Sequence, residues 1–300
     1  MPRSSTSDGQ RAEVAWGLCS YGLDTISTGV SLAFAMECYE KGIISDDSTG
    51  GLDLRFGNAG VLHALIRDTA YRRGFGEILT LGSRRMAERF GRGSEVFAMH
   101  AKGMELGGYD PRAGKSLALV YAAGPRGGCH HAAGYTPFME IALGNGRFST
   151  EGKATMAKQA REITVVKDSA IMCVFVGVAI SDELMSQLLS AATGFELKAE
   201  ELYVIGERGS NVERAFNVRE GLRRSWDTLP QRLLKEPLSS GSTAGQVVDF
   251  EPLLTEFYQA CGWDLETGIP TQERLRSLGL DVIARDMREL TSAVSQQNIQ

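Results

Sequence analysis

Two groups of residues in this sequence have the types and spacing that chemistry needs. The first is Cys129-His130-His131, which follows Arg126 in a glycine-rich stretch. A thiol, two imidazoles and a guanidinium close together are capable of proton transfer, nucleophilic attack or metal binding. Because adjacent side chains in a loop need not face one another, it stays open whether a member of this group is only structural.

The second group consists of two carboxylates near predicted helix starts. Asp24 closes Gly22-Leu23-Asp24 ahead of one helix, and Asp168 opens a segment that ends at Met172-Cys173. An aspartate in such a place is usually a helix cap. The alternative is that both helix N-termini direct backbone N–H groups and carboxylates toward one polar ligand. The sequence by itself leaves both interpretations open.

Helical patterns surround both groups. Apolar residues recur at helical spacing between capping and stop signals over residues 27–40, 58–74, 75–90, 153–162, 169–180, 182–193, 198–223, 252–262 and 271–278. Residues 100–146 are rich in glycine and turn signals, so we expect little regular structure there. The sequence predicts a mainly α fold, with a polar N-terminal tail at 1–17 and two helical domains, 18–98 and 99–300, joined by irregular glycine-rich loops.

Composition and charge exclude several classes of protein. The 300 residues are 43% hydrophobic and 23% charged, as in an ordinary globular protein. A net charge of −5 provides no basic excess for a phosphate backbone, so we expect no nucleic-acid partner. No apolar run reaches the roughly 20 residues that span a bilayer, and no secretory segment begins the chain. We therefore predict a cytoplasmic protein without a membrane partner.

Three ordered segments resemble the tungsten-containing aldehyde ferredoxin oxidoreductase family. They read GLDTISTGVSLAFAMECYEKGII, GLDLRFGNAGVLHALIRDTAYRRGFGEILTLGSRRMAERFG and KGMELGGYDPRAGKSLALVYAAGPRGGCHHAAGY. Further on, VKDSAIMCVFV resembles the family's fourth-cysteine segment, and ERAFNVREGLRR, LPQRLLKEPL and GIPTQERLRSLGL resemble its C-terminal region. The resemblance runs from about Leu18 and assigns 18–98 to part of the family's second domain and 99–300 to its third.

This resemblance implies the oxidation of an aldehyde to a carboxylic acid at a tungsten or molybdenum ion held by two pterins. Electrons would leave through a 4Fe4S cluster to ferredoxin or another acceptor. The family's paired pterin-binding motif, D-x-x-G-L-D and D-x-x-G-L-C, falls on Gly22, Leu23 and Asp24 in the first copy and on Asp168, Met172 and Cys173 in the second. Cys173 matches the last of four cluster-ligating thiolates, and His130 matches the active-site histidine.

Three positions depart from the paired motif. Cys19 stands where the first aspartate is expected, and Ile171 and Met172 replace glycine and leucine. Asp24 and Asp168 are therefore the better supported pterin contacts.

The family also has an N-terminal cofactor-cradling domain and a C-x-x-C-x-x-x-C segment that supplies three cluster thiolates, and we find neither in this sequence. We expect a complementing chain to supply them and no activity from this chain alone. The alternative is a non-catalytic truncated remnant or interaction subunit that keeps the helical scaffold. A cysteine hydrolase built on Cys129 and His130 rests on the local pair only. The substrate stays open, since the family includes reductases of aromatic acyl thioesters. The choice between tungsten and molybdenum, and whether the chain forms a homo-oligomer, also stay open.

Overall fold

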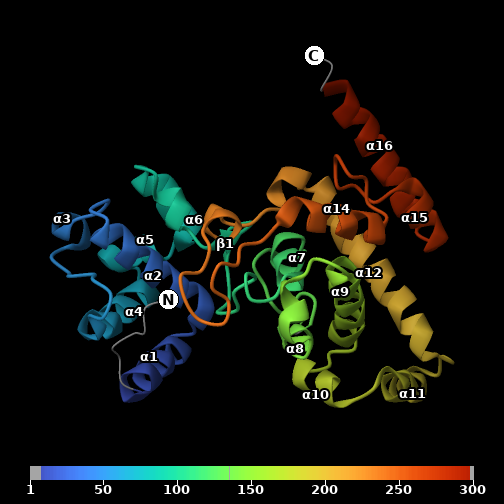
Figure 1. Ribbon diagram of the computed structural model, residues 1–300, viewed down its shortest axis with the longest axis horizontal. Helices are drawn as coiled ribbons and strands as arrows, with labels where there is room; N and C mark the ends of the chain where they lie inside the picture. Colours follow the sequence, from blue (N-terminus) through green and yellow to red (C-terminus); the bar gives the residue numbers. More distant parts are fainter. Residues whose placement is uncertain (1–7, 135, 298–300) are drawn as a thin grey trace. The chain divides into compact units, whose positions relative to one another are not determined.

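The computed structural model describes residues 8–134 and 136–297, which form two compact, mainly helical units (Figure 1). Unit 1 comprises Met1–Gly108 and the short segment Leu229–Arg232, and unit 2 comprises Tyr109–Thr228 and Leu233–Gln300. The prediction of a mainly α fold with two helical parts is confirmed.

Unit 1 contains six α-helices, two 3₁₀ turns and one short hairpin among its described residues. They are α1 (Asp8–Ser20), α2 (Thr25–Glu40), α3 (Asp46–Thr49), η1 (Ala59–Val61), α4 (Leu62–Ala70), α5 (Phe75–Leu79), α6 (Gly82–Phe90), η2 (Ser94–Phe97), β1 (His100–Ala101) and β2 (Met104–Glu105). The strands are antiparallel, with His100 opposite Glu105.

The core of unit 1 forms around α2. Leu32, Phe34 and Met36 of this helix are buried in one cluster with Leu65 of α4 and Met86 of α6. Each such side chain contributes about 1.5–3 kcal/mol on burial. The helix that begins beside Asp24 is therefore firmly seated in its own unit.

Two segments of unit 1 differ from the sequence-based expectation. Residues 8–17, assigned to a polar tail, form most of α1, and Val14 packs against the core. The single helix predicted over 75–90 is broken before Gly82, whose φ is +74°. The buried Glu105 carboxylate causes the break, because it accepts hydrogen bonds from the Ser83 amide (2.7 Å) and hydroxyl (2.9 Å) and so caps α6.

Unit 2 holds the remaining elements: α7 (Ser116–Ala122), α8 (Thr136–Ile141), η3 (Gly144–Phe148), α9 (Lys153–Ser169), α10 (Val174–Ala179), α11 (Asp182–Thr193), α12 (Ala199–Arg219), η4 (Arg224–Trp226), α14 (Phe250–Cys261), α15 (Gln272–Ser277) and α16 (Asp281–Gln297). The return of the chain through unit 1 includes the start of α13 (Gln231–Lys235).

Helix α9 is the centre of unit 2, with α12, α14 and α7 packed against it (Figure 1). Two glycines allow α12 to approach it closely. A Cβ at Gly206 would lie 2.0 Å from the carbonyl oxygen of Glu162, and one at Gly209 would lie 2.4 Å from Val165 Cγ1. These contacts fix α9, the helix that leads to Cys173.

Three expectations for unit 2 are wrong. Residues 116–122, in the stretch expected to lack regular structure, form the wholly buried helix α7. The helix predicted to end near 162 continues to Ser169 because its apolar stripe continues through Ile163 and Val166. A further helix, α16, follows the last predicted one and buries Ala284 and Met287.

No helix among the described residues is long and apolar enough to cross a membrane.

Candidate functional site

The first predicted cofactor-binding segment is a tight turn between α1 and α2. The amide of Gly22 donates to the Cys19 carbonyl (3.1 Å) and the amide of Leu23 donates to the Leu18 carbonyl (3.0 Å). This pair of hydrogen bonds is typical of a helix that ends with a residue in the left-handed conformation. That residue is Gly22, whose φ is +67°. Asp24 then caps α2, because its Oδ1 accepts from the Ser27 amide at 2.6 Å.

The second predicted segment has the same backbone arrangement in unit 2. The amide of Ile171 donates to the Asp168 carbonyl (3.0 Å), and the amide of Met172 donates to the Lys167 carbonyl (2.9 Å). Ile171 is left-handed, with a φ of +56°, and Cys173 is the N-cap residue of α10. The turn keeps its shape although isoleucine replaces the glycine of the motif.

Each turn carries one thiol and one carboxylate, and the two groups stand in opposite order in the two turns. Cys19 and Asp168 each lie in the last turn of the preceding helix, and Asp24 and Cys173 each precede the following helix. All four residues are exposed. The prediction that Asp168 opens a helix is wrong, because α9 runs one residue past it before the chain turns.

Leu23 and Met172 occupy equivalent places and pack inward. Leu23 is half-buried against the core of unit 1, and Met172 is half-buried against the cluster of Val166, Met185 and Leu202 in unit 2. An apolar residue after the left-handed position commonly anchors this kind of turn to the protein. Their side chains therefore hold the turns. The first turn presents backbone and the flanking polar groups, and the second also presents the exposed Ile171 side chain.

Lys167 fixes the short helix that carries Cys173. Its Nζ donates to the carbonyl oxygen of Gly177 at 2.9 Å. A Cβ at Gly177 would lie only 2.7 Å from Lys167 Cδ, so the lysine occupies the space that a side chain would fill. Burial lowers the pKa of Lys167. The sequence analysis missed this pair, although an isolated glycine within an apolar helical run signals a close approach.

Cys173 is one of two exposed cysteines. Cys19 is the other, whereas Cys38, Cys129 and Cys261 are buried. Burial raises the pKa of Cys38 and of Cys261 to about 12, which makes both poor thiolate donors. Within the described residues no three His, Cys, Asp or Glu side chains gather as a metal site. Cys173 is thus the exposed thiol of unit 2 among its described residues.

His130 lies in a half-buried position beside other rings and a cation. Its ring centroid is 4.2 Å from that of His131 and 5.2 Å from that of Tyr109. Burial first, and then the neighbouring His131 and Arg126, lower the pKa of His130 below its usual 6.5. The imidazole is therefore neutral near pH 7 and able to accept a proton.

Cys129 does not form the exposed nucleophile that a cysteine hydrolase needs. It is 9% exposed, and its Sγ accepts a hydrogen bond from Arg126 Nη2 at 3.1 Å. The loop itself is held by Asn217, whose Nδ2 donates to the Pro125 carbonyl at 2.7 Å. Arg126 and Asn217 therefore hold this loop, and the Cys129 thiol is shielded from solvent.

The predicted site residues are divided between the two units. Gly22, Leu23 and Asp24 belong to unit 1, and His130, Asp168, Met172 and Cys173 belong to unit 2. Each unit thus holds one of the two turns that the sequence analysis predicts to bind a pterin.

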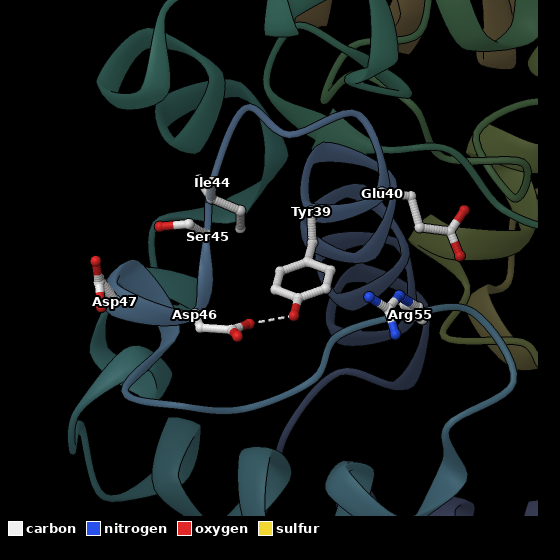
Figure 2. Close-up of a pocket in the computed structure, with 7 residues that line it drawn as sticks. All are labelled: Tyr39, Glu40, Ile44, Ser45, Asp46, Asp47 and Arg55. Carbon is white, nitrogen blue, oxygen red and sulfur yellow. Dashed lines mark hydrogen bonds between the residues drawn. The ribbon is translucent and has the colours of Figure 1, made fainter.

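Unit 1 also contains an open hollow of about 480 Å³ that none of these residues lines (Figure 2). In Figure 2 the Tyr39 hydroxyl donates to the Asp46 carboxylate, and this bond raises the pKa of Tyr39. Glu40 Oε1 accepts from the Phe56 amide at 2.9 Å. Two of the acidic side chains around the hollow thus hold the loop between α2 and α4.

Comparison with known proteins identifies the class first. The family model described as aldehyde ferredoxin oxidoreductase, domains 2 and 3, matches residues 10–280. The chain therefore belongs to the aldehyde ferredoxin oxidoreductase family and corresponds to those two domains.

Among individual proteins, the tungsten-containing aldehyde ferredoxin oxidoreductase of Pyrococcus abyssi is 40% identical over 273 residues, covering 87% of this chain and 44% of the relative. The enzyme of the same name from Thermococcus kodakarensis is 39% identical over 267 residues, covering 87% and 43%. The WOR-like subunit of an aliphatic sulfonate oxidoreductase from Pyrococcus furiosus is 28% identical over 284 residues, covering 90% and 42%. The chain thus spans less than half the length of these relatives.

A solved structure shares the fold. It is the active site complex BamBC of benzoyl coenzyme A reductase with 1,5 dienoyl-CoA, with a TM-score of 0.72, 22% identity, and coverage of 94% of this chain and 48% of that chain. At this identity the likeness concerns the fold.

Proposed function

We propose that this chain forms the C-terminal part of an enzyme that oxidises an aldehyde to a carboxylic acid, taking the added oxygen atom from water and releasing two electrons and two protons. The observation that carries the proposal is the pair of matching turns, which place Asp24 and Cys173 at equivalent backbone positions in a member of this family. The assembly would be cytoplasmic and would pass electrons to ferredoxin or another acceptor.

Two cofactors would be held with the help of these turns. A tungsten, or molybdenum, bispterin would supply the two-electron chemistry, and a 4Fe4S cluster would conduct the electrons away. Asp24 and Asp168 would hydrogen-bond the pterins, with Gly22, Leu23 and Met172 contributing backbone. The exposed Cys173 thiolate would be one cluster ligand, held in place by α10 and Lys167.

His130 would act as a proton acceptor in this reaction. Its lowered pKa leaves Nδ1 or Nε2 free of a proton near pH 7, so the ring can accept one of the two protons that the reaction releases. The rings of its neighbours Tyr109 and His131 contact the imidazole. We expect His130→Ala to lower turnover about 10²- to 10⁴-fold in the cofactor-containing assembly while leaving metal content unchanged. His63→Ala, at an exposed histidine of unit 1, is the control. Full activity of His130→Ala on every aldehyde tested would contradict the role.

The remaining parts of the site would come from polypeptide outside these 300 residues. The chain covers 44% of the Pyrococcus abyssi relative, and a 4Fe4S cluster requires four ligands. Produced by itself with iron, sulfide and tungsten or molybdenum supplied, the chain should carry no stoichiometric cluster and oxidise no aldehyde. Elemental analysis and electron paramagnetic resonance under anaerobic conditions would measure this. One reducible cluster per chain, with dye-linked aldehyde oxidation, would contradict it.

A second candidate function is a non-catalytic interaction subunit. Ile171 favours it, since 95% of this apolar side chain is exposed on a turn where the motif has glycine. Either function predicts that the chain by itself associates and binds a dye for apolar surface, so a strictly monomeric particle that binds no dye would contradict both. Cofactor content of the assembly separates them.

A further inference from the structure

A small polar cavity lies inside unit 2, where α9 and α12 meet. Its volume is about 10 Å³. Six polar side chains of these two helices line it, namely Lys158, Arg161, Glu162, Glu207, Ser210 and Asn211. None of the residues predicted to hold a pterin or a cluster is among those that line it. The cavity is therefore separate from the site described above.

Two polar atoms in the cavity wall have no hydrogen-bond partner within the described part of the chain. They are Nε of Arg161 and the hydroxyl oxygen of Ser210. Arg161 is 4% exposed and Ser210 is 6% exposed, so bulk solvent does not satisfy either atom. Arg161 Nη2 donates to the backbone carbonyl of Ser210 at 3.4 Å, which makes the two residues direct neighbours. Buried polar groups are nearly always hydrogen-bonded, to protein or to ordered water.

The Arg161 guanidinium is held at its other nitrogens. Nη1 donates to the carbonyl of Ala123, the C-cap residue of α7, at 3.2 Å. Nη2 also lies 3.3 Å from Glu213 Oε2. Because the guanidinium is planar and rigid, these contacts fix the direction of the Nε–H bond as well. The side chain therefore cannot turn Nε toward another acceptor without losing the Ala123 and Glu213 contacts.

The other polar groups around the cavity leave the two carboxylates as available acceptors. Asn211 Oδ1 accepts from Trp263 Nε1 at 3.0 Å, and Asn211 Nδ2 donates to the Glu207 carbonyl at 2.9 Å. Lys158 Nζ donates to the Glu162 carboxylate and lies 3.3 Å from Glu207 Oε1. A carboxylate can accept about four hydrogen bonds. Glu162 and Glu207 can therefore also accept from a small ligand in the cavity.

We propose that this cavity binds one water molecule, which accepts hydrogen bonds from Arg161 Nε and the Ser210 hydroxyl and donates to Glu162 or Glu207. A cavity of about 10 Å³ has room for a single water and for nothing larger. A buried water makes about three hydrogen bonds, which these side chains provide. The carboxylates disfavour an anion, and the guanidinium and ammonium groups disfavour a cation. The water belongs to the contact between α9 and α12 and is independent of the proposed function.

A second cavity in unit 2 has about the same volume, close to 10 Å³, and serves as an internal comparison. Its wall includes Leu119, Val120, Ala157 and Phe257, and Arg161 provides the one polar side chain among the described residues that line it. A small cavity with an apolar wall stays dry. We therefore expect water in the polar cavity and none in the apolar one.

The direct test is a crystal structure of the full chain at a resolution that shows ordered waters. We expect one peak within hydrogen-bond distance of Arg161 Nε and Ser210 Oγ, and no peak in the apolar cavity. Magnetic relaxation dispersion of the water oxygen counts long-lived internal waters in solution. Ser210→Val removes the hydroxyl and fills the space, so it should lower the dispersion amplitude by about one water. Ser240→Val, at an exposed serine of the same unit, is the control and should leave the amplitude unchanged.

A polar cavity without a peak, a peak in the apolar cavity instead, or density of an ion in place of water would overturn the inference. An unchanged amplitude in folded Ser210→Val would overturn it as well. If Ser210→Val does not fold, the crystal structure of the unmodified chain decides the question by itself.

Discussion

Replacing Ile171 by glycine should make unit 2 more stable, which is unusual for a substitution that removes an apolar side chain. Ile171 has a φ of +56° and is 95% exposed. Its side chain therefore contributes almost no burial, while its Cβ is forced into a backbone conformation that suits glycine.

The magnitude follows from two opposing effects. The left-handed conformation costs a residue with a Cβ about 1–2 kcal/mol. Glycine also gives the unfolded chain more conformational freedom, and this offsets about 0.5–1 kcal/mol of the stabilisation. The expected net stabilisation is about 0.5–1 kcal/mol, which corresponds to a rise in Tm of roughly 1–4 °C for a unit of this size.

Urea unfolding followed by the fluorescence of Trp263 measures this effect, because Trp263 is 3% exposed and lies in unit 2. Ile171→Ala is the matched control: it keeps a Cβ at the same φ and should change stability little. Gly22→Ala is the converse change in unit 1. Nothing lies within 4 Å of the Cβ it would add, so its expected cost of about 1 kcal/mol comes from φ alone.

A loss of stability in Ile171→Gly of about 0.5 kcal/mol or more would refute this reasoning. It would mean that the isoleucine side chain makes contacts that its exposure does not show. An unchanged stability in Gly22→Ala would refute the claim that both turns impose the same backbone.

The remaining predictions concern contacts around the same elements. Gly177→Ala should lower the free energy of unfolding by about 1–3 kcal/mol, because the new Cβ meets Lys167, and by much less when Lys167 is also replaced by alanine. Additive losses of stability in this double-mutant cycle would contradict the contact. Lys153→Met should cost about 3–5 kcal/mol by leaving Glu140 charged, buried and unpaired, and adding Glu140→Gln should recover part of it, as urea unfolding would show. Burial lowers the pKa of His130, so NMR titration should find a pKa below 6.5. Between the folded and the unfolded pKa values of His130, the unfolded chain binds more protons than the folded chain. The contribution of His130 to stability is therefore complete above pH 6.5 and is lost as the pH falls. The His130→Gln variant should accordingly lose less stability than the wild type between about pH 7 and 5.5. A His130 pKa above 6.5 would contradict this.

Local signals in the sequence were sufficient where neighbouring residues determine the structure. Asp24 caps α2, which is one of the two interpretations that the sequence left open, and a cap depends only on the next turn of the helix. The fold class follows in the same way from apolar periodicity. The end of α9 could not be predicted, because Asp168, Ser169 and Ala170 carry no stop signal and the helix closes through a left-handed isoleucine.

Contacts between distant residues were beyond prediction from one sequence. Glu105 breaks a helix 22 residues earlier by accepting from Ser83, and nothing in the local pattern of 75–90 reveals this. The ring contacts of Tyr109 with His130 and with Phe138 likewise join residues that are distant in the sequence. The site residues themselves came from the resemblance to a family, and their roles stay predictions.

The central claim is that Cys173 of this chain ligates a cluster in a cofactor-containing assembly. The most direct test is to purify the tagged chain anaerobically from its own cells and measure iron, tungsten, molybdenum and the electron paramagnetic resonance signal of the reduced protein. The account predicts about four irons for each chain, with tungsten or molybdenum present. Cys173→Ser should remove the cluster signal, and Cys19→Ser, at the other exposed cysteine, should retain it. A full cluster signal in Cys173→Ser, or wild-type chain free of iron, tungsten and molybdenum, would contradict the account.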